Sequence, residues 1–199
     1  MKLSNVADIR SGLILSRKMA HKKTAYTYPL LNLKSINSNA TINKQTLDVF
    51  NASEQLNQEY LAQSGDIVVR MSTPYTAILI NKDTQGMVVS SNFVIIRCKT
   101  EKILPDYLFW YLNTEDIKKD ILKNSARNML AAIRPQYFSD LELMLLSLKQ
   151  QRLIADINLT ARKEIELLKK LQNQKIKYYQ KCLDDTYQLL LRKQKENII

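Results

Sequence analysis

Several short polar segments of the sequence carry side chains suited to holding a phosphate backbone and base edges. A basic stretch contains Arg17, Lys18, Lys22 and Lys23, and Tyr26 follows it. Cationic side chains bind phosphates, and Arg, Ser, Thr and Asn can hydrogen-bond to base edges. The candidate DNA contacts are Arg17, Lys18, Lys22, Lys23, Tyr26, Lys34, Arg70, Ser72, Thr73, Tyr75, Ser91, Asn92, Arg127, Asn128 and Arg134.

Each of these segments also has a plainer explanation. Basic loops are commonly just solvated, and a polar turn such as residues 70–75 is an ordinary way to end a strand. Arg134, directly before Pro135, is equally compatible with a phosphate contact and with a surface charge. The segments therefore predict a DNA-binding surface only when they are taken together.

Patterns of the common catalytic sites are missing from the sequence. Its three glycines are scattered, so no glycine-rich loop can cradle a nucleotide. The lone histidine, His21, has no obvious nucleophile nearby, and Asp66, Asp83 and Glu101 lack the clustering that a magnesium site needs. We therefore expect no enzyme activity, no metal and no cofactor in this chain, and its two cysteines are expected to be reduced thiols.

The charge balance points to a polyanionic partner. The chain has 30 basic and 19 acidic residues, a net charge of +11, and a pI near 9.6. Such a balance most often accompanies nucleic-acid binding, although a lysine-rich proteome would produce it too. No apolar run approaches the ~18–20 residues of a membrane span, and the N-terminus lacks a signal-peptide core, so a soluble cytoplasmic protein is expected.

The sequence pattern that predicts secondary structure changes near residue 148. Before it, short apolar runs alternate with turn signals, which predicts an α+β fold with a mixed α/β domain at 1–147. A short helix or strand is expected at 3–9, strands at 28–33, 65–71, 75–80 and within 87–98, helices at 105–112 and 115–123, and a final strand at 141–145.

Residues 148–199 lack glycine and proline and predict one long helix. Ser147 and Gln150 have the spacing of a capping box at its start. An apolar stripe with a period of 3.6 follows, so the helix needs a partner helix. A hairpin broken near residues 182–186 is the alternative. The candidate pairing residues are Ile157, Ala161, Ile165, Leu168, Ile176, Tyr179 and Leu183.

Five segments, taken in order, resemble those of a type I restriction–modification specificity (S) subunit. The resemblance is to its half-length form, with one target-recognition domain and one conserved long helix. The matching segments are residues 2–12, 65–70, 104–112, 124–133 and 148–154. Residues 143–147 lack the proline-rich phrase usual before the helix. The family commonly carries two recognition domains and two helices in one chain.

The resemblance implies sequence-specific recognition of double-stranded DNA in the major groove. The helix would set the separation of half-sites and dock a DNA adenine methyltransferase (modification) subunit. A restriction subunit would join in the full complex. S-adenosylmethionine, ATP and Mg would belong to these partner subunits. Two copies, or this chain and a second half-subunit, would pair through their helices, and a homodimer would recognise a bipartite palindromic target.

Two other functions remain compatible with the sequence. The chain could be a solitary target-recognition or adaptor module of another phage-defence methyltransferase system. It could also be a basic helical structural protein whose charge only keeps it in solution. Recovery of an adenine methyltransferase with the chain would favour the type I specificity subunit over a solitary module. Salt-dependent DNA binding would exclude a purely structural protein.

Overall fold

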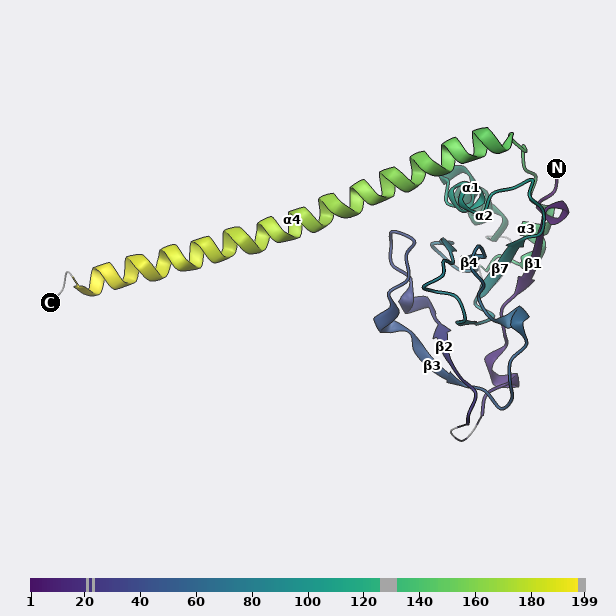
Figure 1. Cartoon of the computed structure of the whole chain (residues 1–199), viewed down its shortest axis with the longest axis horizontal. Helices are drawn as coiled ribbons and strands as arrows, with labels where there is room; N and C mark the ends of the chain where they lie inside the picture. The colour runs from purple at the N-terminus through teal and green to yellow at the C-terminus, as the bar shows by residue number, and fades with distance from the viewer. Residues whose placement is uncertain (21, 23, 126–131, 197–199) are drawn as a thin grey trace. The chain divides into compact units, whose positions relative to one another are not determined.

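The computed structural model describes residues 1–20, 22, 24–125 and 132–196. The chain divides into two units, Met1–Ala155 and Asp156–Ile199. The first contains sheets and short helices, and the second contains most of a long helix, α4 (Leu148–Glu196; Figure 1). The α+β fold class is confirmed. The domain boundary at 147/148 stays a prediction, because α4 begins at Leu148 while the first unit continues to Ala155.

Two sheets form the frame of the first unit in the part of the chain that the structure describes. The larger is antiparallel, in the order β1 (Ala7–Ser11), β7 (Phe93–Cys98), β4 (Ile67–Arg70) and β5 (Ala77–Leu79). The smaller has the order β3 (Asp48–Asn51), β2 (Thr27–Leu31) and β6 (Val88–Val89), with β2 antiparallel to β3 and parallel to β6.

The larger sheet is buried on both faces, which explains the unbroken apolar runs of its central strands. Side chains alternate along a strand, so Ile67 and Val69 belong to one core and Val68 to another. The first core includes the helix residues Leu108 and Phe138, and the second includes residues of the smaller sheet. The first unit therefore has three layers: helices, larger sheet, smaller sheet.

Among the described residues, three short helices follow the last strand and pack on one face of the larger sheet, and short 3-10 turns lie before and between the strands. They are α1 (Pro105–Leu112), α2 (Glu115–Ser125) and α3 (Pro135–Asp140), with 3-10 turns η1 (Leu3–Asn5), η2 (Leu15–Arg17), η3 (Leu33–Ser35), η4 (Lys44–Thr46) and η5 (Gln58–Tyr60). Pro105 starts α1, where no amide donor is needed. Asn113 ends it, and its side chain bonds both the backbone N–H and C=O of Ala77, at 3.2 and 3.0 Å.

The start of α4 is fixed by the two glutamines near its N-terminus. The backbone N–H of Ser147 donates to Oε1 of Gln150 at 3.0 Å, and the N–H of Gln150 donates to Ser147 Oγ at 3.4 Å, which confirms the predicted capping box. Buried Gln151 donates to the carbonyls of Lys102 and Leu146 and accepts from the N–H of Leu104. These bonds attach the first turns of α4 to the first unit.

The predicted strand at 141–145 is wrong. This segment bonds to the first residues of the chain through an isolated bridge between Lys2 and Glu142, so its alternating leucines fill the core beside the N-terminus without entering a sheet. Residues 3–9 form both expected elements, η1 followed by β1. No helix in the described residues is both long and apolar enough to cross a membrane.

Candidate nucleic-acid interface

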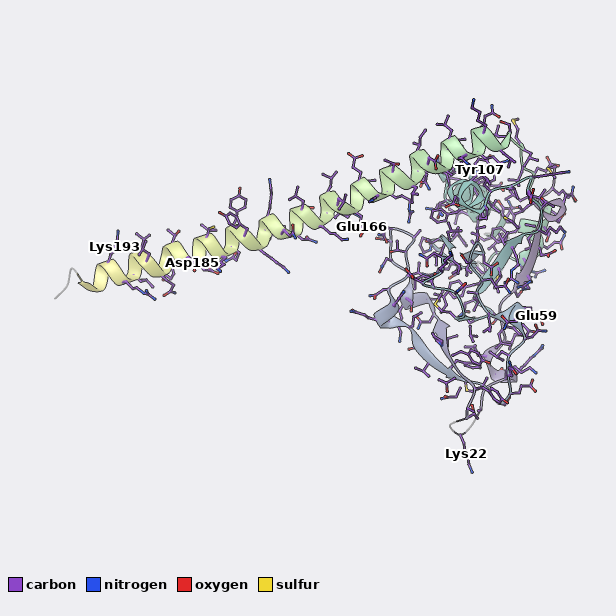
Figure 2. All side chains as sticks on the ribbon, viewed as in Figure 1. Lys22, Glu59, Tyr107, Glu166, Asp185 and Lys193 are labelled. Carbon is purple, nitrogen blue, oxygen red and sulfur yellow. The ribbon has the colours of Figure 1, made fainter. Side chains whose placement is uncertain are left out.

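One group of the predicted contact residues lies where η2, β2 and β3 meet, and we call Arg17, Lys18, Lys22 and Tyr26 the tip cluster. The N–H of Ala20 donates to the carbonyl of Asn51 at 2.9 Å, which holds the basic segment beside the end of β3. Lys22 lies at the outer end of its loop, and its side chain points away from the strands (Figure 2). The tip cluster therefore places the cationic side chains of Arg17, Lys18 and Lys22 and the aromatic ring of Tyr26 in the segment from η2 to β2.

A second group lies at one end of the larger sheet, and we call Arg70, Ser72, Thr73, Ser91 and Asn92 the sheet-end cluster. Arg70 pairs in register with Phe93, and its Nε donates to Ser72 Oγ at 3.1 Å. The N–H of Met71 donates to the carbonyl of Asn92 at 3.0 Å. Two loops far apart in sequence are thus joined, and their arginine, hydroxyl and amide groups suit base edges.

Arg134 joins the sheet-end cluster through its neighbour in sequence. The N–H of Ile133 donates to the carbonyl of Met71 at 2.9 Å, so the exposed Arg134 lies next to this end of the sheet. The predicted contacts Lys23, Arg127 and Asn128 lie outside the described residues, as does His21.

The tip and sheet-end clusters are linked by Leu13. Its carbonyl accepts from the N–H of Ser91 at 2.8 Å, and η2 begins two residues later. The approach is close: a Cβ added to Gly12 would lie 2.2 Å from the carbonyl oxygen of Ser90. Glycine is therefore required at position 12. The backbone that passes Ser91 at Leu13 continues directly into η2, so it connects the two clusters.

Two predicted contacts do not join these clusters. Tyr75 is only 3% exposed, and its hydroxyl is 2.7 Å from Ser125 Oγ in the core, so the expectation that it touches DNA is corrected. Lys34 follows the far end of β2 from Tyr26 and pairs with Asp48 at 2.7 Å. That hydrogen bond lowers the pKa of Asp48.

The charges of the interface are partly balanced by carboxylates. Lys18 forms an ion pair with Glu54, whose hydrogen bond raises the pKa of Lys18. The Lys18 and Lys34 pairs are both exposed, and exposed pairs are weak enough to be exchanged for phosphate. Arg97 differs because it forms two 2.7 Å hydrogen bonds with buried Asp66. Arg97 therefore stabilises the fold through Asp66, and its charge is not available to a partner.

Helix α4 exposes the apolar side chains that were predicted to pair. Six of the seven predicted residues are large, and these are between 52% and 66% exposed. Sequence reasoning missed Leu167, Leu171 and Tyr178, which are also exposed. Their spacing of four and seven residues was the available signal of a second stripe. The apolar surface of α4 is therefore wider than the predicted stripe.

A comparison with protein families matches residues 1–178 to the type I restriction modification DNA specificity domain. The chain belongs to this specificity family. The match confirms the expected resemblance and spans both the tip and sheet-end clusters and most of α4. A comparison with curated proteins finds no matching relative.

Solved structures share the fold of this specificity-family chain. The HsdS subunit from Thermoanaerobacter tengcongensis is 16% identical, with a TM-score of 0.61. A chain from a study of complex assembly and conformational transition of the type I R-M system is 17% identical, with a TM-score of 0.60. Both matches cover 87% of this chain, but only 44% and 40% of the solved chains. The chain thus spans less than half of each.

Proposed function

We propose that this chain recognises a specific sequence in double-stranded DNA for a type I restriction–modification complex. The observation that carries the proposal is the family match over residues 1–178, which includes the sheet-end cluster. Its arginine, hydroxyl and amide groups come from two loops that the sheet holds in register. A rigid scaffold that presents polar loops is the usual design of a recognition site. In this proposal the sheet-end cluster contacts bases and the tip cluster contacts phosphates.

The same proposal assigns the catalytic steps to partner subunits. An adenine methyltransferase subunit would bind S-adenosylmethionine, and a restriction subunit would use ATP and Mg. This chain would supply target choice and hold the methyltransferase. Pairing of two copies through α4 would restore a two-fold arrangement, and the exposed apolar surface of that helix supports it.

Salt-dependent binding tests the proposal. The chain, together with its methyltransferase, should bind duplex DNA with an affinity that falls about 10³–10⁵-fold between about 50 and 200 mM salt, as expected for about 6–10 phosphate contacts. Fluorescence anisotropy with labelled duplexes measures this. A complex that does not bind duplex DNA even at low salt would overturn the proposal.

Two variants separate the roles of the clusters in that assay. Lys22→Ala should weaken binding to all sequences and reduce the salt slope by about one, because it removes one phosphate contact. Arg70→Ala should cost about 1–3 kcal/mol on the preferred sequence only. Lys82→Ala is the matched control, since this exposed lysine follows the opposite end of the β4–β5 pair.

A further inference from the structure

Tyr75 lies in the turn that joins β4 to β5, and its backbone conformation is unusual. Its φ of 53° falls in the left-handed region, which bulky residues rarely adopt. The N–H of Tyr75 donates to the carbonyl of Ser72 at 2.9 Å. The N–H of Arg70 donates to the carbonyl of Thr76 at 3.0 Å, which closes the turn. Backbone strain of this kind persists only where the surroundings hold it, and it is concentrated at functional sites.

The side chain of Tyr75 is buried and joins this turn to helix α2. It lies in the core that the larger sheet shares with the helices. Its hydroxyl oxygen is 2.7 Å from Oγ of Ser125, which is the last residue of α2 and is itself fully buried. The same Oγ lies 2.9 Å from the carbonyl oxygen of Leu122. A chain of hydrogen bonds therefore connects the turn to the end of α2.

The direction of both hydrogen bonds follows from the groups involved. A serine hydroxyl has one proton to donate, and the carbonyl of Leu122 can only accept. Ser125 therefore donates to Leu122, and the phenol of Tyr75 donates to Ser125. The Leu122 carbonyl lies in the last turn of α2, where the helix backbone provides no donor. Loss of either hydroxyl would leave a buried partner without its hydrogen bond, which is costly.

The same turn is attached at a second point, next to Arg134. The N–H of buried Ile133 donates to the carbonyl of Met71 at 2.9 Å. Residues 72–73 of the sheet-end cluster therefore lie between two fixed points, at Met71 and at Tyr75. The conformation of this turn depends on contacts with residues about fifty or more positions further along the chain.

We infer that Tyr75 is a positioning residue for sequence recognition and acts through its buried hydrogen bond to Ser125. It holds the turn in the conformation that presents Arg70, Ser72 and Thr73 to DNA, and it does not touch DNA itself. The inference rests on the function proposed above and adds a residue that determines its specificity. Contacts to base edges depend on precise geometry, whereas phosphate contacts supply general affinity. A turn that loses its fixed point should therefore lose discrimination between sequences before it loses affinity for DNA in general.

A purely structural role for the hydroxyl pair predicts a different result. Its loss would lower the free energy of unfolding but leave recognition unchanged, because the molecules that stay folded would present the same surface. Two measurements separate the roles. The first is the ratio of the affinities for a preferred and a scrambled duplex, and the second is the midpoint of urea unfolding. Asp66→Asn serves as the stability control, because it breaks the buried pair with Arg97 at the far end of β4.

Tyr75→Phe and Ser125→Ala test the inference in the chain assembled with its methyltransferase. The preferred duplex is the one that the wild-type complex selects from a random pool. Each variant should lower the affinity ratio about tenfold, the scale of one base contact. Affinity for the scrambled duplex and the salt slope should keep their wild-type values, because the phosphate contacts remain. The double variant should lower the ratio no further than the stronger single variant, since both remove the same hydrogen bond.

Tyr28→Phe is the matched control for the loss of a phenol hydroxyl. That hydroxyl accepts from the N–H of Leu56 at 3.2 Å beside the smaller sheet, so its removal should leave the affinity ratio unchanged. An unchanged ratio in both Tyr75→Phe and Ser125→Ala would overturn the inference. An equal fall of the ratio in Asp66→Asn would assign the effect to lost stability and would also overturn it. Both results leave the proposed function intact, whereas a wild-type complex that does not bind duplex DNA would overturn that function as well.

Discussion

Burial separates the charged residues of this chain that stabilise the fold from those available to a partner. Asp66 is 1% exposed, and it accepts two hydrogen bonds from Arg97 and one from the N–H of Gln63 at 2.8 Å. Lys18 and Lys34 also have carboxylate partners, but on the surface. The sequence alone does not distinguish the buried charges from the exposed ones. The basic count therefore overstates the charge that is free to meet DNA.

Asp66→Asn should destabilise the first unit by about 3 kcal/mol, the lower end of the cost of leaving one member of a buried ion pair unpaired. Arg97 would keep its charge beside a neutral amide. Urea unfolding of the full chain, followed by circular dichroism, measures the loss. Asp48→Asn is the control: it breaks the exposed pair with Lys34 and should leave the midpoint nearly unchanged. Equal shifts for the two variants would contradict this account.

The candidate site was only partly predictable at the scale of single residues. Residue type indicated which side chains can meet phosphates or bases, and the sheet does gather Arg70, Ser72 and Asn92. The sequence could not show that Tyr75 turns into the core, because its partner Ser125 lies 50 residues further along. Partners distant in sequence leave no local pattern.

Elements with strong local signals were predicted correctly. The start of α1 at Pro105 and the start of α4 after Ser147 follow from proline and capping preferences that operate within a few residues. Strand β4 has three consecutive buried residues, which an unbroken apolar run indicates. The edge strand β3 was missed because only Phe50 in it is buried. Strand pairing there depends on β2, not on an apolar pattern.

Helix α4 exposes many large apolar side chains, which indicates that it packs against a partner. Ile165→Glu/Leu168→Glu should convert a dimer into monomers, because it places charges in a surface that must be dehydrated on pairing. Sedimentation of the full chain gives the mass, and circular dichroism checks that the helix persists. Asn173→Glu/Gln180→Glu adds the same charges on the opposite side of α4 and should stay dimeric. An unchanged mass for the first variant would place the interface elsewhere.

The positive charge of the molecule is divided between its two parts. Residues 149–199 carry 12 of the 30 basic residues and 6 of the 19 acidic ones, so the helical region is at least as basic as the rest. Helix α4 carries these basic residues together with its exposed apolar side chains. Those residues could follow a DNA backbone or meet an acidic partner subunit. The helical region therefore contributes to the expected salt dependence of the assembly.

A two-fold pair of identical chains should recognise two identical half-sites in opposite orientation. Mapping methylated positions in DNA exposed to this chain and its methyltransferase should therefore give a bipartite motif that is the same on both strands. If α4 sets the spacing, seven helix-forming residues inserted between Asp156 and Ile157 should preserve the half-sites but lengthen the spacer. The insertion adds about 10.5 Å per copy, up to about six base pairs in total. The same insertion after Leu190 lies beyond Leu183, the last of the predicted pairing residues, and should leave the spacer unchanged. An asymmetric motif would show that two identical copies do not recognise the target. A spacer whose length does not change with the first insertion would show that α4 does not set the spacing.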